Sequence, residues 1–177
     1  LQMGDYWTTY FSQYAWGRSG VFQEGRHLLT SGQEEPRTHE LGHTISLGAN
    51  QFVRFPDDYY SYDKYFDRVH GLNGVSGYAH QAVSFHGYRG MALDALGGKI
   101  DFLELMQFCV PPGPLAVEHY YRFLDLGCRL TALGGSDFPW CGRGRRAGEE
   151  PVGPQIGDAR FYTYVGGELN YERWLAG

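Results

Sequence analysis

Two histidines four residues apart, His39 and His43, fit the HExxH pattern of zinc metalloproteases together with Glu40. On a helix, this spacing puts both imidazoles on one face to hold zinc, and the glutamate acts as general base. The flanking residues argue against a helix, because Pro36 lies just upstream and residues 44–48 alternate polar and apolar side chains as a strand does. We therefore expect His43 at the beginning of a β-strand and keep the zinc metalloprotease as an alternative.

A second set of candidate ligands is scattered along the chain, at or near predicted strands. The candidates are Glu34, His43, His80, Glu104 and Asp137. In α/β proteins, the ligands of one site gather outside the carboxyl ends of the strands. Mixed imidazole and carboxylate ligands suit zinc, manganese or iron, and a bridging carboxylate can hold two ions roughly 3.5–4 Å apart. We expect Glu34, His43, His80 and Asp137 to point into one cleft.

Three of these positions leave an alternative open. Glu34 and Glu35 compete for one role, because a shift of one residue along a strand turns the other side chain toward the site. We favour Glu34. Glu104 could instead form an ion pair with a nearby Arg or Lys, and Asp137, which follows Gly-Gly-Ser, could cap a turn.

The elements that must position these residues follow from the hydrophobic pattern. Short apolar runs alternate with helical stretches, which is typical of β-α units and a largely parallel sheet. The predicted strands are 26–31, ending at Gly32, and 43–48, 74–79, 100–106, 129–133 and 160–165. The predicted helices are 63–69, 88–96, 114–126 and a last one that begins at Asn170.

Length and composition indicate one globular domain, and we expect a small-molecule substrate as its partner rather than nucleic acid or a membrane. The 177 residues exceed the roughly 100–150 at which domains cluster, but do not suffice for two full domains. A net charge of -5 gives no basic field, so nucleic acid is not an expected partner. No apolar run approaches the roughly 18 residues of a membrane span. Three cysteines without CxxC spacing indicate neither a zinc knuckle nor a disulfide framework.

Several motifs, taken in order, resemble the CehA/McbA-like branch of the PHP (polymerase and histidinol phosphatase) metallohydrolases. They are Gly-His43-Thr-Ile-Ser-Leu-Gly, Gly-Tyr-Ala-His80, Gly-Lys-Ile-Asp-Phe-Leu-Glu104, Leu-Gly-Gly-Ser-Asp137 and Arg160-Phe-Tyr-Thr-Tyr-Val. The resemblance covers nearly the whole chain. It implies an α/β fold of the distorted (β/α)₇ barrel type and two or more divalent metal ions (Zn, Mn or Fe) in the full-length protein. It also implies hydrolysis of ester, carbamate or phosphoester bonds through a metal-activated water.

In this reading Glu34, His43, His80 and Asp137 are the catalytic metal ligands, with Glu104 as a further ligand. The sequence departs from the family pattern at three places. It has no His-x-His motif, so we interpret residues 1–177 as a single domain that lacks its first strand. Phe138-Pro139 stands where a histidine is expected, and Tyr6 follows Asp5 where the family has Asp-His. These departures keep a third hypothesis open, a degenerate PHP-like domain that binds without catalysis.

Overall fold

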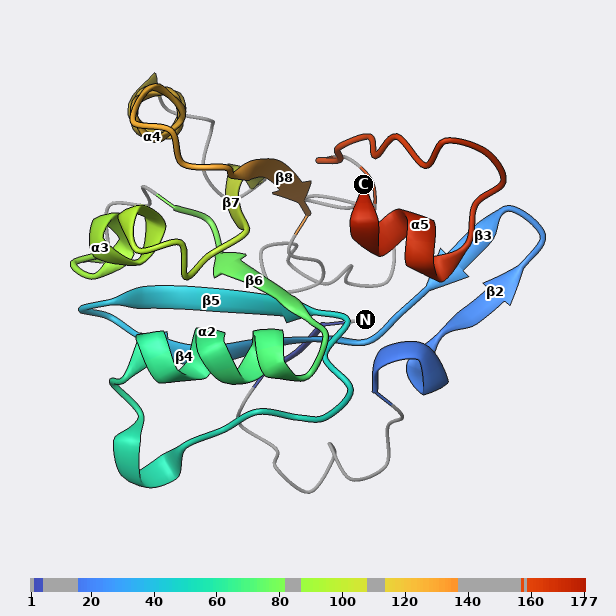
Figure 1. Ribbon diagram of the computed structural model, residues 1–177, viewed down its shortest axis with the longest axis horizontal. Coiled ribbons are helices and arrows are strands. Elements are labelled where there is room, and N and C mark those ends of the chain that lie inside the picture. Colours follow the sequence, from blue (N-terminus) through green and yellow to red (C-terminus); the bar gives the residue numbers. More distant parts are fainter. Residues whose placement is uncertain (1, 5–15, 82–86, 108–113, 137–156, 158) are drawn as a thin grey trace, which may run out of the picture.

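The computed structural model describes residues 2–4, 16–81, 87–107, 114–136, 157 and 159–177. A mixed six-stranded sheet lies at its centre (Figure 1). Across the sheet, the strands are β1 (Gln2–Gly4), β4 (Gly32–Thr38), β5 (Gly42–Leu47), β6 (Val75–Tyr78), β7 (Phe102–Gln107) and β8 (Thr131–Gly135). A separate hairpin pairs β2 (Phe22–Glu24) with β3 (His27–Leu29). The helices are α2 (Tyr62–Gly71), α3 (Met91–Leu96), α4 (Pro114–Asp125) and α5 (Tyr171–Ala176), with 3-10 turns η1 (Gly17–Gly20) and η2 (Pro56–Asp58).

The predicted distorted (β/α)₇ barrel is wrong. In the part of the chain that is described, the sheet is open, with β1 and β8 at its edges. Strand β5 runs antiparallel to both β4 and β6, while the other neighbouring pairs are parallel. Only residues 39–41 link β4 to β5, and a connection this short makes a hairpin, since parallel neighbours need a crossover of a dozen or more residues. The sequence prediction ends a strand at Gly32, whereas β4 begins there.

The hydrophobic core lies between one face of the sheet and α2, α3 and α4. Helix α2 buries Tyr62, Tyr65, Phe66 and Val69, whose spacing repeats every three or four residues and makes one apolar stripe. Phe66 packs edge-on against Tyr78 of β6, with ring centroids 5.8 Å apart. This stripe therefore holds α2 against β4, β5 and β6 (Figure 1).

Hydrogen bonds from two tyrosine hydroxyl groups of α2 show which face of β5 is turned to the core. Tyr62 donates a hydrogen bond to the Gly42 carbonyl (2.6 Å), and Tyr65 donates one to the Ser46 hydroxyl (2.9 Å). Ser46 is thus on the α2 side, together with the fully buried Thr44. Because side chains alternate along a strand, His43 is directed to the opposite face.

Most predicted elements are present. Helices α2, α4 and α5 and strands β6, β7 and β8 lie where the pattern predicts them, and Asn170 caps α5 by accepting a hydrogen bond from the Arg173 backbone (2.9 Å). Helix α3 begins three residues after the predicted start at Tyr88. The predicted strand 160–165 is wrong, since Tyr162 and Tyr164 point into solvent and no strand forms there.

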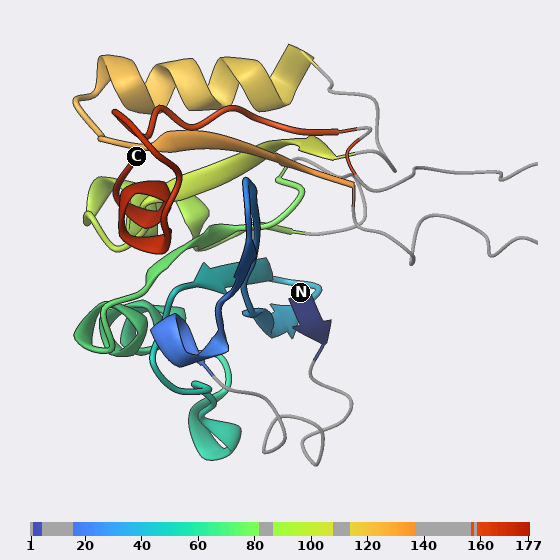
Figure 2. The same cartoon turned by 90° about the vertical axis from the view of Figure 1, so that its right-hand side faces the viewer.

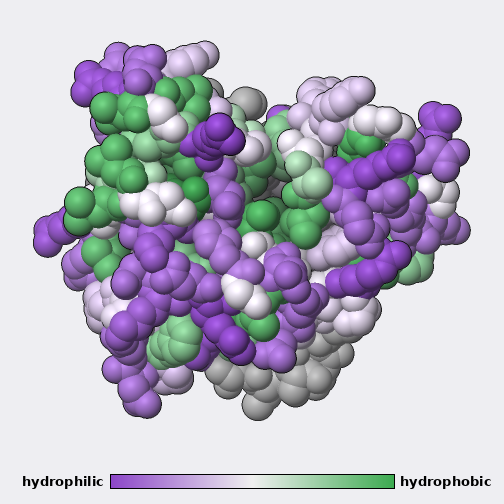
Figure 3. Space-filling model, in the orientation of Figure 1, coloured by the Kyte–Doolittle hydropathy of each residue, from purple (hydrophilic) through white to green (hydrophobic). Residues whose placement is uncertain are grey.

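The face opposite the core is partly covered by the β2–β3 hairpin and α5. These two elements lie side by side in both views (Figures 1 and 2), and the Gln23 side-chain amide donates a hydrogen bond to the Leu169 carbonyl (2.9 Å). Elsewhere, apolar side chains are exposed over α3 and α4 (Figure 3), among them Leu93 and Leu124. None of the described helices has the length and apolar character that crossing a membrane requires.

Candidate metal centre

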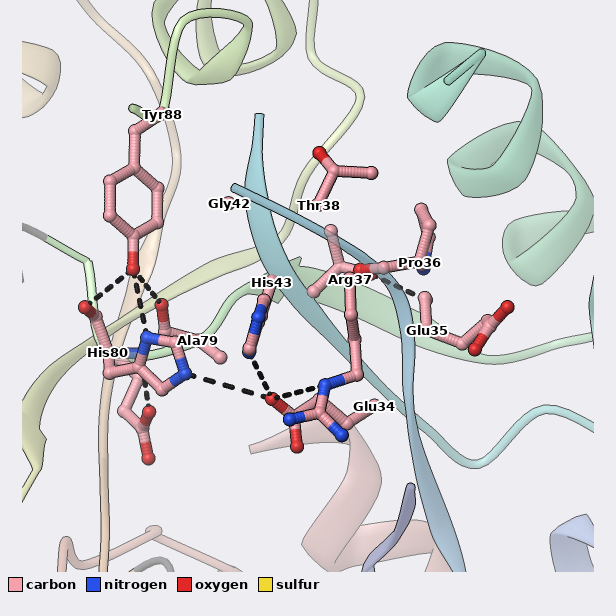
Figure 4. Close-up of polar contacts among 12 residues, drawn as sticks. Glu34, Glu35, Pro36, Arg37, Thr38, Gly42, His43, Ala79, His80 and Tyr88 are labelled. Atoms are coloured by element: carbon pink, nitrogen blue, oxygen red, sulfur yellow. Dashed lines mark hydrogen bonds and ion pairs between the residues drawn. The ribbon is translucent and has the colours of Figure 1, made fainter. Parts of the chain in front are cut away.

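The β4–β5 hairpin brings Glu34 and His43 together. The register of the pair shifts by one residue between Glu34 and Arg37, which marks a β-bulge. In a regular strand, residues three apart point to opposite faces, and the bulge turns both Glu34 and Arg37 toward the face that carries His43. The His43 Nδ1 atom lies 2.7 Å from Glu34 Oε1, and Arg37 Nε lies 3.4 Å from the same oxygen (Figure 4).

His80 reaches the same carboxylate from the end of β6. Its Nε2 atom lies 3.7 Å from Glu34 Oε1, and its ring centroid is 4.9 Å from that of His43. The backbone of His80 has φ +30°, a left-handed conformation that costs a non-glycine residue about 1–3 kcal/mol. Two hydrogen bonds hold it there: His80 N donates to Glu104 Oε2 (2.5 Å), and the Tyr88 hydroxyl donates to His80 O (2.7 Å).

Glu34, His43 and His80 therefore form a compact group of possible metal ligands. One ligand atom from each lies within 4.8 Å of the others, and among the residues that the structure describes no other such group exists. Zinc is ligated at roughly 2.0–2.2 Å, so the three side chains would adjust their positions around a bound ion. Two imidazoles and one carboxylate are a ligand set of catalytic zinc sites that leaves a fourth position for water. The same set also holds non-haem iron(II).

The charges within the group suit a cation. Burial alone would raise the pKa of Glu34, but the hydrogen bond with His43 and the positive charge of Arg37 outweigh it, and this pKa is lowered to about 2. Burial lowers the pKa of His43 below its usual value, although the hydrogen bond with Glu34 acts in the opposite direction. At neutral pH, the group thus offers an ionised carboxylate and an uncharged His43 imidazole, which are the protonation states that ligate metals.

The choice between Glu34 and Glu35 is decided by the strand alternation. Glu35 points to the other face of the sheet, where its side chain is 1% exposed and its Oε1 lies 3.1 Å from Arg54 Nε. The tyrosines of α2 lie on that side, and the negative charge of Glu35 contributes to the raised pKa of Tyr65, after burial itself. Glu35 therefore belongs to the buried interface with α2, and Glu34 lies on the face that carries His43 and His80.

Two further candidates stand apart from the group. Glu104 is buried on β7, but its carboxylate accepts the hydrogen bond of the His80 backbone instead of joining the ligand atoms. Glu104 also leaves no space for a side chain at Gly135, where a Cβ atom would lie 2.6 Å from Glu104 Oε1. Asp137 lies outside the described residues, so its predicted role stays a prediction.

The HExxH string does not form a metalloprotease site. That alternative requires a helix through residues 37–47, and these residues form the β4–β5 hairpin instead. His39 and Glu40 are exposed in the turn, while His43 is a residue of β5, as its alternating neighbours predict. The two histidines therefore do not share a helical face.

Sequence reasoning missed two residues that contact the group, Arg37 and Tyr88. Arg37 joins Glu34 only because of the β-bulge, which nothing in its own spacing indicates. Tyr88 is predicted as the start of a helix, yet its hydroxyl lies 2.9 Å from Nδ1 of His80. Burial, followed by the negative charges of Glu104 and Glu34, raises the pKa of Tyr88 and keeps its hydroxyl protonated.

A cavity of about 610 Å³ lies along the same face of the sheet. Ile45, which pairs with Glu34 across the hairpin, is part of its wall, and Glu104 is another part. Apolar side chains contribute most of the rest: Leu28, Leu29, Leu47, Leu133, Phe161 and Trp174. Glu34, His43 and His80 do not line the cavity themselves, and it adjoins their group through Ile45 and Glu104.

Comparisons with known proteins give no match to this chain among family models, curated proteins or solved structures. The resemblance to the PHP metallohydrolases therefore stays a prediction. What the described residues do establish is a group, Glu34, His43 and His80, that can hold a metal ion.

Proposed function

We propose that this chain is a metal-dependent hydrolase of small-molecule esters, carbamates or phosphoesters. The observation that carries the proposal is the convergence of Glu34, His43 and His80, with one ligand atom from each within 4.8 Å of the others. A divalent ion held by these three residues would polarise the scissile bond and lower the pKa of a water molecule toward 7. We expect a single ion at this triad, of zinc, manganese or iron.

The side chains around the triad support hydrolysis rather than a purely structural ion. A structural zinc site is closed by four protein ligands, whereas the described residues supply three. Arg37 places a positive charge beside Glu34, and hydrolysis develops negative charge on a substrate oxygen, which a nearby positive charge stabilises. Arg37 is therefore the candidate for stabilising that charge, and Glu34, His43 and His80 hold the ion.

The cavity along the sheet supports a small-molecule substrate. Its volume of about 610 Å³ lies within the roughly 300–1,000 Å³ of sites that bind such molecules. Its wall is mainly apolar, with Arg26 and His27 as the basic residues. A substrate with an apolar portion in this cavity would have its reacting group near Ile45 and Glu34.

Metal binding and turnover, measured on the same variants, test the proposal. Zinc or manganese binding to the metal-free protein is followed by isothermal titration calorimetry, and turnover with p-nitrophenyl acetate, a p-nitrophenyl carbamate and p-nitrophenyl phosphate. We expect stoichiometric binding and metal-dependent hydrolysis of at least one of these, and His43→Gln and His80→Gln should each lose both. His39→Gln is the matched control, because this exposed histidine lies in the same hairpin and should keep both properties.

Two outcomes would contradict the proposal. If His39→Gln abolished metal binding as thoroughly as His43→Gln, the ligands would be those of the HExxH string. If the wild-type protein bound metal at the triad but hydrolysed none of the three compounds, the non-catalytic binding domain would be favoured.

A further inference from the structure

The hydroxyl group of Tyr88 makes three polar contacts with the end of β6. It lies 2.9 Å from His80 Nδ1, and it can donate to the carbonyl oxygens of His80 (2.7 Å) and Ala79 (3.0 Å) (Figure 4). We propose that Tyr88 is a positioning residue that fixes the tautomer of His80, so that His80 presents Nε2 to a divalent cation. This inference rests on the metal centre proposed above.

The assignment of the protons follows from counting donors. Carbonyl oxygens only accept hydrogen bonds, and a phenol has one proton to donate. The Tyr88 proton is therefore directed to the carbonyl oxygens of Ala79 and His80, and the phenol oxygen is left to accept from His80. The acceptor role of Tyr88 requires the proton of the neutral His80 ring to be on Nδ1. Nε2 then carries the lone pair, on the side of the ring that faces Glu34 at 3.7 Å.

The two histidines of the triad differ in the hydrogen-bond partner of their Nδ1 atoms. His43 turns its Nδ1 atom to the Glu34 carboxylate itself, whereas His80 turns Nδ1 away from the group and onto Tyr88. Histidine ligands of metals almost always have their second nitrogen hydrogen-bonded, and this partner sets the ring orientation and tautomer. Tyr88 thus has the place of that partner for His80.

Tyr88 is itself held by the hairpin that carries the other two ligands. A Cβ atom on Gly42 would lie 2.5 Å from the Tyr88 ring, so the ring packs directly on the backbone of β5. On either side of Tyr88, the Gly87 N–H donates to His39 O (2.6 Å) and the Arg89 N–H to Glu40 O (3.2 Å). The position of the hydroxyl group is therefore coupled to the β4–β5 turn, and His80 is aligned with Glu34 and His43.

Loss of the hydroxyl should weaken metal binding without removing a ligand. In Tyr88→Phe, the His80 ring can rotate or change tautomer, and loss of such a partner costs about 10–100-fold in metal affinity. Tyr65→Phe is the matched control, because Tyr65 is more deeply buried than Tyr88 and gives up one hydrogen bond, to Ser46, on the opposite face of the sheet. A general effect of removing a buried hydroxyl would appear in both variants.

The test combines zinc affinity, from competition with a chromophoric chelator, with nitrogen-15 NMR of the His80 ring in the metal-free protein. We expect the Nδ1–H tautomer in the wild-type protein, a loss of about 10–100-fold in zinc affinity in Tyr88→Phe, and wild-type affinity in Tyr65→Phe. An Nε2–H tautomer in the wild-type protein would overturn the inference, and so would equal zinc affinity in Tyr88→Phe and wild type.

The two proposals fail in different ways. A wild-type protein that binds no zinc would refute the metal centre, whereas the tautomer of His80 is measured without metal and reports on Tyr88 alone. If Tyr88→Phe did not fold, the wild-type spectrum would still decide the inference.

Discussion

Replacing Glu34 with glutamine should remove a large part of the acid sensitivity of the metal-free protein. The pKa of Glu34 falls from 4.5 to about 2 on folding, because the hydrogen bond with His43 and the charge of Arg37 outweigh the effect of burial. A pKa lowered in the folded state means that the unfolded state binds the proton more tightly. The carboxylate therefore adds stability that is fully present above pH 4.5 and is lost as the pH falls toward 2.

The magnitude follows from the size of the shift. One pKa unit corresponds to about 1.4 kcal/mol, so the lowering is worth about 3 kcal/mol of unfolding free energy. The Glu34 side chain is only 10% exposed, so solvent screens these interactions little. The lowered pKa of His43 also makes the folded protein less stable as the pH falls, but in a higher pH range. The contribution of His43 to the unfolding free energy is fully present above pH 6.5 and declines below it.

Urea unfolding, followed by circular dichroism at pH 7 and at pH 3, measures the effect. Between pH 7 and pH 3, the unfolding free energy of the wild-type protein should fall by about 2 kcal/mol more than that of Glu34→Gln, because pH 3 lies about 1.5 units below the unfolded pKa of 4.5. Glu40→Gln removes a carboxylate from the exposed turn of the same hairpin, and its unfolding free energy should fall by as much as that of the wild-type protein. An identical loss in wild type and Glu34→Gln would refute the electrostatic account of the ligand group.

Three further predictions concern the metal and the core. Zinc at a hundred times its dissociation constant should raise the unfolding free energy by about 2.7 kcal/mol, and an excess of EDTA should reverse the rise in melting temperature. Zinc affinity, measured by calorimetry, should be nearly constant above pH 6.5 and fall at lower pH as protons compete for His43, whose pKa is lowered by burial. Phe66→Ala should cost about 3–5 kcal/mol in urea unfolding, because Phe66 is fully buried between α2 and β6, while the exposed Leu93→Ala should change stability little.

The hydrophobic pattern predicts the helices and the later strands, but it does not predict how the first strands pair. Helix α2 is predicted by the spacing of the apolar residues from Tyr62 to Val69, and α4 by the turn residues at its ends. Both signals are local in the sequence. The antiparallel hairpin of β4 and β5 depends instead on where β4 begins, and this strand begins at Gly32, where the pattern predicts the end of a strand. The predicted barrel came from the resemblance to the PHP metallohydrolases, whereas the hydrophobic pattern itself predicts only a largely parallel sheet.

The candidate site shows the same division between local and long-range information. The residue types of Glu34, His43 and His80 predict metal ligands, and the alternation after His43 predicts its strand. Glu104 illustrates the limit, because only the three-dimensional structure reveals that its carboxylate binds the backbone of His80. The β-bulge that brings Arg37 to Glu34 likewise depends on the pairing partner and leaves no periodic signal in the sequence.

The most direct test of the metal centre is anomalous X-ray diffraction at the zinc absorption edge, from crystals of the wild-type protein grown with zinc. The account predicts one strong peak among Glu34, His43 and His80, with Nε2 of His80 and a carboxylate oxygen of Glu34 about 2.0–2.2 Å from the ion. The absence of a peak there, or a peak beside His39 and Glu40 instead, would contradict it.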